Sequence, residues 1–154
     1  MLQVFKELID AFTEPDQESA EASARALKLA TAVLLVEVKR ADPATSVAER
    51  DTVMATLRQK FALDDEEAAR LFELAESTGL TASDYYQFTS RINESLTHPQ
   101  KIGLIENMWQ IAYSDGHLDA NENQLISKIA GLLYVTQGEY IGAKMRAKEA
   151  AGLL

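Results

Sequence analysis

The chain has 154 residues, 47% of them hydrophobic, with seven glycines, three prolines and no cysteine. This composition predicts a single globular domain over residues 1–154, and it excludes disulfides, thiolate metal sites and cysteine nucleophiles. The formal net charge of −9 argues against nucleic acid as a partner, because affinity for phosphate depends on clustered Lys and Arg.

The N-terminal sequence, the apolar runs and the absence of cysteine favour a cytoplasmic protein. The N-terminus lacks the basic and apolar regions of a secretory signal. The most apolar run, residues 29–36, is too short to cross a bilayer, so we expect no direct insertion into a membrane.

Apolar residues at helical spacing predict helices along the whole chain. The first covers residues 2–12. After Pro15 a second helix runs to Asp42, where Pro43 disfavours helical geometry. Because residues 27–38 are apolar on nearly all sides, we expect this helix to lie in the middle of the protein.

The later helix starts share one signature, a capping residue followed three positions later by an acid or an amide. The pairs are Ser46/Glu49, Asp64/Glu67, Thr81/Asp84, Thr97/Gln100, Asp119/Glu122 and Thr136/Glu139. No segment shows the alternation of a strand. The sequence therefore predicts an all-α fold of about seven to eight helices in antiparallel hairpins.

Two acidic turns have the same spacing of carboxylates. Asp42 precedes Glu49 by seven residues, and Asp115 precedes Glu122 by seven residues. The apolar residues before each turn align at the same offset. This repetition predicts two pseudo-symmetric half-repeats, each with an acidic turn of the same spacing.

The second turn has two interpretations of its own. In the first, Asp119 and Glu122 only cap a helix, where the dipole favours an anion by roughly 0.3–1 kcal/mol. That interpretation leaves Asp115 unexplained, since it follows a helix C-terminus. In the second, Asp115 to Glu122 forms the later half of an EF-hand loop, but Ile111 and Tyr113 stand where the first oxygen ligands belong.

A third interpretation combines the two turns in one metal site. Its candidate ligands are Asp42, Glu49, Asp115, Asp119 and Glu122, with Glu37 one helical turn before the first aspartate. Two carboxylates about 4 Å apart repel by roughly 4 kcal/mol at an effective dielectric constant near 20, so a converged cluster needs a cation or a raised pKa. All-oxygen ligands favour Ca²⁺, Mg²⁺ or Mn²⁺ over Zn²⁺, and His117 is the nearby residue that could recruit a softer ion.

At these residues the sequence resembles the TerB-like family, named for tellurite-resistance proteins and related to the N-terminal domain of a membrane-anchored DnaJ-like co-chaperone. The resemblance covers roughly residues 25–148, and three segments carry it: residues 35–42 followed by Glu49, residues 111–122, and residues 126–135. The chain departs from the family pattern at Pro43, in place of a glycine, and at His117, in place of an acidic residue.

The resemblance implies an all-helical fold with internal pseudo-symmetry and a metal site formed by the paired turns. That site would use Asp42, Glu49, Asp115 and Glu122. We expect a non-enzymatic cytoplasmic module that binds a divalent cation and acts in a tellurite-type stress response or as a scaffold for protein partners. The alternative is a metal-free protein-interaction domain whose acidic motifs are only helix caps. Metal-assisted hydrolysis is a third hypothesis, for which the sequence offers carboxylates but no catalytic constellation.

Overall fold

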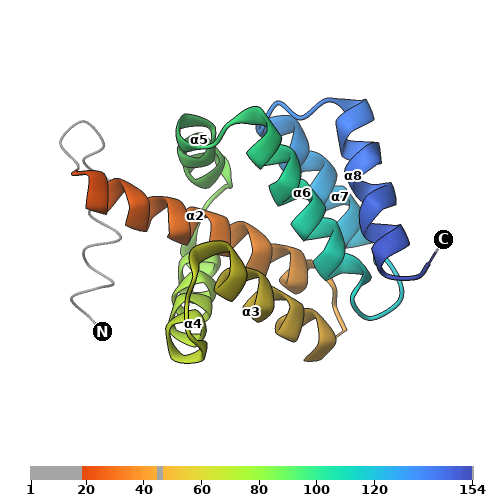
Figure 1. Ribbon diagram of the computed structural model, residues 1–154, viewed down its shortest axis with the longest axis horizontal. Helices are drawn as coiled ribbons and strands as arrows, with labels where there is room; N and C mark the ends of the chain where they lie inside the picture. Colours follow the sequence, from red (N-terminus) through yellow and green to blue (C-terminus); the bar gives the residue numbers. More distant parts are fainter. Residues whose placement is uncertain (1–18, 45–46, 154) are drawn as a thin grey trace.

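The computed structural model describes residues 19–44 and 47–153, and within them the protein has seven helices and no strand (Figure 1). The helices are α2 (Ala20–Ala41), α3 (Val47–Phe61), α4 (Asp65–Thr81), α5 (Tyr86–Ser95), α6 (His98–Tyr113), α7 (Ala120–Leu132) and α8 (Gln137–Ala150). The predicted all-α fold is confirmed. The predicted helix over residues 2–12 lies outside the described residues, as do Pro15 and Ser46.

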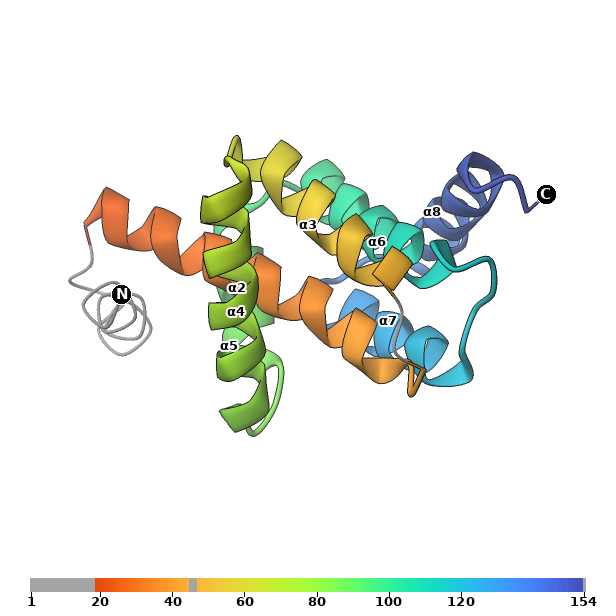
Figure 2. The ribbon, with the colours of Figure 1, turned by 90° about the horizontal axis from the view of Figure 1, so that it is seen from below.

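Helix α2 is the central element of the fold, as its apolar sequence predicts. Every residue from Leu29 to Val38 is buried, including Thr31 and Glu37. The helix contacts α3, α4, α5, α6 and α7, so its neighbours cover it on most sides (Figures 1 and 2). It ends at Ala41, and Asp42 adopts an extended conformation before Pro43, as the proline requires.

Four of the predicted capping boxes are present, with both reciprocal hydrogen bonds formed in each. They are Asp64/Glu67, Thr97/Gln100, Asp119/Glu122 and Thr136/Glu139. Each cap contributes on the order of 1 kcal/mol and fixes where its helix begins.

The predicted box at Thr81 and Asp84 is wrong. Helix α4 continues through Thr81, whose hydroxyl donates to the carbonyl of Thr78 at 3.2 Å instead of capping the next helix. Helix α5 begins at Tyr86, two residues after Asp84, and its N-cap residue Tyr85 gives it no side-chain cap. The carboxylate of Asp84 accepts from the amide of Tyr86 at 2.9 Å, so it closes a local turn.

The two acidic turns lie at the same end of the molecule. One joins α2 to α3 and the other joins α6 to α7, and both views of the ribbon show them side by side (Figures 1 and 2). Because α6 also contacts α2 and α3, the ends of two helices and the starts of the next two meet there. The internal pseudo-symmetry itself stays a prediction.

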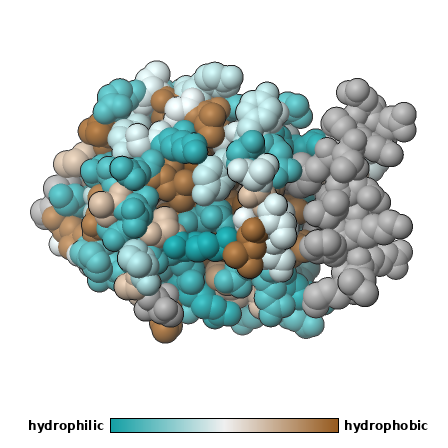
Figure 3. Space-filling model, turned by 180° about the vertical axis from the view of Figure 1, so that it is seen from behind, coloured by the Kyte–Doolittle hydropathy of each residue, from teal (hydrophilic) through white to brown (hydrophobic). Residues whose placement is uncertain are grey.

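The surface carries exposed apolar side chains in small groups. On the face seen from behind, small groups of apolar residues are separated by polar ones (Figure 3). The most exposed large apolar residues are Tyr134, Val47, Leu80 and Tyr86. No described helix is long and apolar enough to cross a membrane.

A candidate metal centre at two acidic turns

Asp42 ends α2 and faces the second turn. Its backbone N–H donates to the carbonyl of Lys39, and its Oδ1 accepts from the amide of Ala44 at 2.9 Å. Only 7% of the residue is exposed. Its Oδ2 is buried and has no donor apart from neighbouring carboxyl groups. An anion just beyond a helix C-terminus opposes the helix dipole, so this placement does not serve the stability of α2.

Glu49 and Glu122 occupy the first turns of α3 and α7, where the helix dipole favours a negative charge. Both residues are 0% exposed, although glutamate is almost never fully buried unless it is paired. Oε1 of Glu122 accepts from the N–H of Asp119 at 3.3 Å, which completes the capping box of α7. Its Oε2 is buried and faces the cluster, with the carboxyl of Glu49 as its neighbour.

Asp115 and His117 are held together by a tight turn around Gly116. The glycine has φ +91°, a left-handed conformation that L side chains rarely adopt. Its amide donates to the carbonyl of Tyr113 at 3.0 Å. Asp115 Oδ1 accepts from the amide of His117 at 3.2 Å and lies 3.4 Å from the Nδ1 of the same residue. The aspartate is half-buried, whereas the imidazole is 67% exposed.

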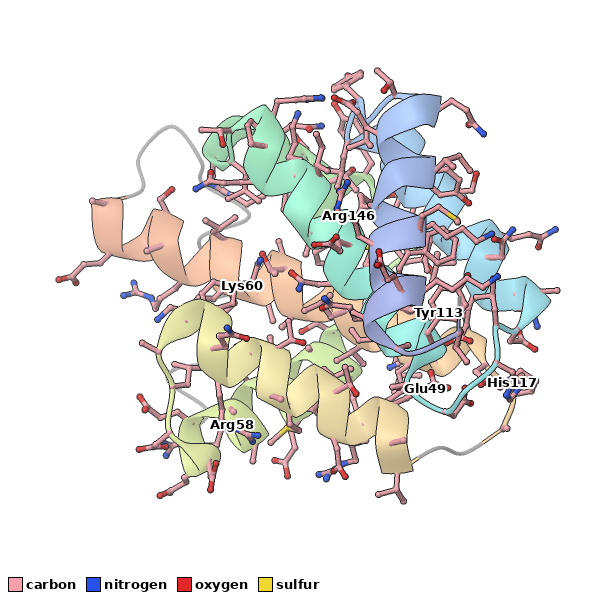
Figure 4. The ribbon with its side chains drawn as sticks, turned by 45° about the vertical axis from the view of Figure 1, so that its right-hand side comes forward. Glu49, Arg58, Lys60, Tyr113, His117 and Arg146 are labelled. Atoms are coloured by element: carbon pink, nitrogen blue, oxygen red, sulfur yellow. The ribbon has the colours of Figure 1, made fainter. Side chains whose placement is uncertain are left out.

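The structure brings two groups of potential ligand atoms within 4.8 Å of one another. The first comprises Asp42, Glu49 and Glu122, all buried, and the second comprises Asp42, Asp115 and His117. Figure 4 shows Glu49 on α3 directed toward the link between α6 and α7, with His117 at the outer side of that link. Four carboxylates that are far apart in sequence therefore form one cluster, with Asp42 common to both groups.

The cluster changes the proton affinities of its members. Burial, together with the carboxyl groups of Glu122 and Asp42, raises the pKa of Glu49. Burial also raises the pKa of Glu122, against the hydrogen bonds that it accepts from Glu49 and from the backbone of Asp119. Burial alone would raise the pKa of Asp42, but hydrogen bonds from the Ala44 amide and the Glu49 carboxyl hold it below its ordinary value.

These shifts describe a protein that retains a proton when no cation is present. The proton resides on Glu49, whose single O–H donates to the carboxylate of Asp42 or to that of Glu122. A divalent cation at the same place would neutralise the carboxylates more fully than one proton does. Three oxygen donors within 4.8 Å suit a hard cation, since oxygens on opposite sides of Ca²⁺ are about 4.6–5.2 Å apart at its usual bond lengths.

Asp119 and Glu37, both predicted as ligands, lie outside these groups. Asp119 is the N-cap of α7, and its Oδ2 accepts from the amide of Asn121 at 2.8 Å. Glu37 faces α4 and α5: its Oε1 lies 2.7 Å from the guanidinium of Arg40, and its Oε2 is 3.5 Å from the hydroxyl of Tyr85. Burial nevertheless raises the pKa of Glu37, with Arg40 opposing that effect.

Because Glu37 lies against Gly79 on α4, alanine at this position should destabilise the protein. An alanine Cβ there would overlap with Oε1 of Glu37 and press the buried carboxylate away from Arg40. We expect Gly79→Ala to lower the free energy of unfolding by about 1–2 kcal/mol, the cost of leaving a buried polar group without its partner.

Gly103 on α6 supplies the matched control, because an added Cβ there meets nothing within 4 Å. Gly103→Ala should raise the free energy of unfolding by roughly 0.5–1 kcal/mol, the usual helix preference for alanine over glycine. Urea denaturation of the two variants measures both effects. Stabilisation of similar size in both variants would show that the Glu37 side chain can move away from the added Cβ without loss of stability.

Together, the fold and the cluster define an all-helical module. Its buried carboxylate centre lies where the turn between α2 and α3 meets the turn between α6 and α7. A family model described as tellurite resistance protein TerB matches residues 28–145. The match covers most of the chain, so this protein belongs to the TerB family, and the resemblance noted in its sequence is confirmed. Comparison with curated proteins and with solved structures found no significant match.

The sequence located four of the clustered residues but not their division into two groups. The roles of Asp42 as the shared residue and of His117 as part of the second group depend on how α2 meets the α6–α7 turn. The one signal in the sequence was the position of His117, two residues after Asp115 in a turn that contains glycine.

Proposed function

We propose that this TerB-family protein binds a divalent cation with Asp42, Glu49 and Glu122, and that cation binding serves an interaction module in a tellurite-type stress response. Ca²⁺, Mg²⁺ and Mn²⁺ are the expected ions, with Zn²⁺ less favoured at an all-oxygen site. The observation that carries the proposal is the burial of three carboxylates from three different elements within one small volume.

The burial of these carboxylates supports metal binding over capping as their role. Capping contributes on the order of 1 kcal/mol for each helix and needs no burial, as the exposed caps of α4, α6 and α8 demonstrate. Repulsion between two carboxylates at about 4 Å costs roughly 4 kcal/mol at an effective dielectric constant near 20. Because the cost exceeds the gain, the cluster needs a proton or a cation, and a divalent cation would neutralise it more fully than the proton on Glu49 does.

The metal-free alternative has one specific observation in its favour. Glu122 caps α7 with one oxygen while it faces the cluster with the other, so at least one of the ligands also has a capping role. In that case the protein would act through its surface alone, with a protein partner and no resident ion. The described residues show no nucleophile–base pair of a hydrolase, and we propose no catalytic activity.

Thermal unfolding in the presence of each ion tests the proposal. At 100 times its dissociation constant, an ion that binds only the folded state raises the free energy of unfolding by roughly 2.7 kcal/mol. We expect this increase with at least one of Ca²⁺, Mg²⁺ and Mn²⁺, and we expect Glu49→Gln to abolish it. If no ion shifts the transition, or if the variant responds as the wild type does, the protein is not a metal-binding module.

Glu73→Gln is the matched control for that variant. It removes the same charge from an exposed position on α4, outside both groups of potential ligands. It should leave the response to the ion unchanged, so a loss in both variants would indicate a general effect of net charge.

A further inference from the structure

We infer that the hollow between α5 and the end of α7 binds an arginine side chain of a protein partner. Its volume is about 300 Å³, at the lower end of the range for ligand pockets, which suits one long side chain. It lies at the opposite end of α7 from the acidic turns, roughly 18 Å away along the helix, so its role does not depend on the proposed cation site.

One face of α5 forms a wall of the hollow. The residues of α5 that line it are Tyr86, Ser90, Asn93 and Glu94. They recur at intervals of three and four residues, so they lie on the same side of the helix. Asn93 donates from Nδ2 to the carbonyl of Leu132 at 3.0 Å, and its Oδ1 accepts from the ammonium of Lys101 at 3.1 Å. Because these hydrogen bonds join α5 to α7 and α6, the hollow is formed before a partner binds.

Tyr134 also lines the hollow, and its backbone conformation is unusual for a tyrosine. It follows the end of α7 with φ +61°, a left-handed conformation in which glycine is the usual residue at a helix C-terminus. Its amide donates to the carbonyl of Gly131, and the amide of Val135 donates to that of Ala130, which is the Schellman arrangement. A tyrosine has a conformational cost there that a glycine does not have.

Burial of the Tyr134 side chain does not offset this cost. The residue is 73% exposed, so its ring adds little to the core. The ammonium of Lys101 lies 5.6 Å from the centre of the ring, and Lys101 is itself only 8% exposed, so it supports the ring from the protein side. An exposed aromatic ring at a strained position is better explained by a contact with a partner than by the stability of α7.

The charge of the hollow favours a cation. Glu94 is the single charged residue among those that line it, and its side chain is 63% exposed. The guanidinium of Arg91 lies 4.0 Å from Oε2 of Glu94, beyond hydrogen-bond distance. Arg91 and Lys101 are both buried, and neither lines the hollow. In a chain with a net charge of −9, this carboxylate complements a basic partner and disfavours an acidic one.

A guanidinium matches these groups better than an ammonium does. It is planar and stacks on an aromatic ring, and its fork of N–H groups donates two parallel hydrogen bonds to one carboxylate. Tyr86 and Tyr134 supply exposed rings, and Glu94 supplies the carboxylate. A lysine would keep the attraction to the rings but not the paired hydrogen bonds. We therefore expect arginine to bind in preference to lysine.

Proton NMR titration of the full chain with short peptides tests this assignment. The probes are acetyl-Gly-Ser-Xaa-Ser-Gly-amide, where Xaa is arginine, lysine or citrulline, the uncharged analogue of arginine. A chelator is present throughout, so the result does not depend on a bound metal. We expect the arginine peptide to shift the ring protons of Tyr86 and Tyr134, and its own δ-methylene protons to move upfield over the rings. The lysine peptide should bind at least threefold more weakly, and the citrulline peptide at least tenfold more weakly.

Tyr134→Gly separates a binding role from a structural one. It should weaken binding of the arginine peptide at least tenfold, while its thermal midpoint stays equal to or above that of the wild type, because glycine favours the left-handed conformation. Ala62→Gly is the matched control. Ala62 has φ +53° after the end of α3 and does not line the hollow, so this variant should raise the midpoint and leave binding unchanged. Glu94→Gln, at an exposed carboxylate, should weaken binding at least threefold.

Three results would overturn the arginine site. The first is the absence of any shift with the arginine peptide, and the second is equal binding of the arginine and citrulline peptides. The third is wild-type affinity in Tyr134→Gly or in Glu94→Gln. Self-association of the wild type that Tyr134→Gly abolishes would instead assign the hollow to an arginine of a second copy of this chain, which would overturn the choice of a different protein as the partner.

Discussion

Raising the pH of the metal-free protein from about 5 to 8 should lower its free energy of unfolding by more than about 1.4 kcal/mol, the equivalent of one unit of pKa. The carboxyl groups of Glu49 and Glu122 are responsible, since burial and the neighbouring carboxyl groups raise the pKa of Glu49 to about 10 and that of Glu122 to about 7. Urea denaturation in the presence of a chelator, repeated across this range, measures the change.

The sign follows from the protons that each state binds. Below the ordinary carboxyl pKa both states are protonated, and the stabilising effect of the raised pKa is fully present. As the pH rises, the unfolded chain releases its protons first, while the folded protein retains them, so the stability falls. The lowered pKa of Asp42 acts in the opposite direction, but its effect lies below about pH 4, outside the range measured.

Substitution of Glu49 isolates the cluster from other titrating groups. Glu49→Gln removes the charge that burial penalises, so the fall in stability between pH 5 and 8 should become much smaller. Glu73→Gln, on the exposed face of α4, should keep the wild-type slope. Saturation with the hard cation should remove the fall as well. If the free energy of unfolding of the metal-free wild type stayed constant or rose between pH 5 and 8, the folded protein would not retain the proton on Glu49.

Replacing Trp109 should have the largest effect on stability of any single core substitution. The side chain is fully buried on α6 between two aromatic rings, 6.0 Å from Tyr113 and 5.3 Å from Tyr140 between ring centroids. The ammonium of Lys144 lies 5.0 Å from its ring. Trp109→Ala should lower the free energy of unfolding by about 3–5 kcal/mol, the usual cost of such a truncation.

Trp109→Phe should cost less than half as much, for a reason specific to this site. The indole Nε1 is buried and has no hydrogen-bond partner in the described part of the chain. Phenylalanine keeps one ring in the aromatic cluster and removes this unsatisfied N–H, which offsets part of the lost volume. Because Trp109 is the only tryptophan, circular dichroism must follow the unfolding of these variants.

Met145 gives the comparison at the surface of α8, where it is 42% exposed. Met145→Ala should change the free energy of unfolding by less than about 1 kcal/mol, since little apolar area leaves the core. If Trp109→Ala cost no more than Met145→Ala, the packing of α6 against α8 would differ from the one described.

The sequence by itself determined the elements of this protein and most of their ends. Periodicity predicted the helices because an apolar stripe must recur every three to four residues to face a core. Residues 27–38 are apolar on nearly all sides, which predicted that α2 is central, and Pro43 fixed the end of this helix. The capping pairs succeeded where the two side chains complete each other's backbone hydrogen bonds. They failed at Thr81, which is the last residue of α4 and whose hydroxyl donates to a backbone carbonyl of its own helix instead of capping the next one.

Only the tertiary structure decided which acidic residues meet. Six carboxylates were candidate ligands, and only the family resemblance favoured four of them, since their spacing in the sequence says nothing about which helix faces which. The packing of α6 against α2 and α3 brings the two turns together and buries Glu49 and Glu122. The same packing directs Glu37 toward Arg40, because residues on one helix point to different neighbours as the helix turns. Charge density, and with it the proposed affinity for cations, arises from this long-range contact.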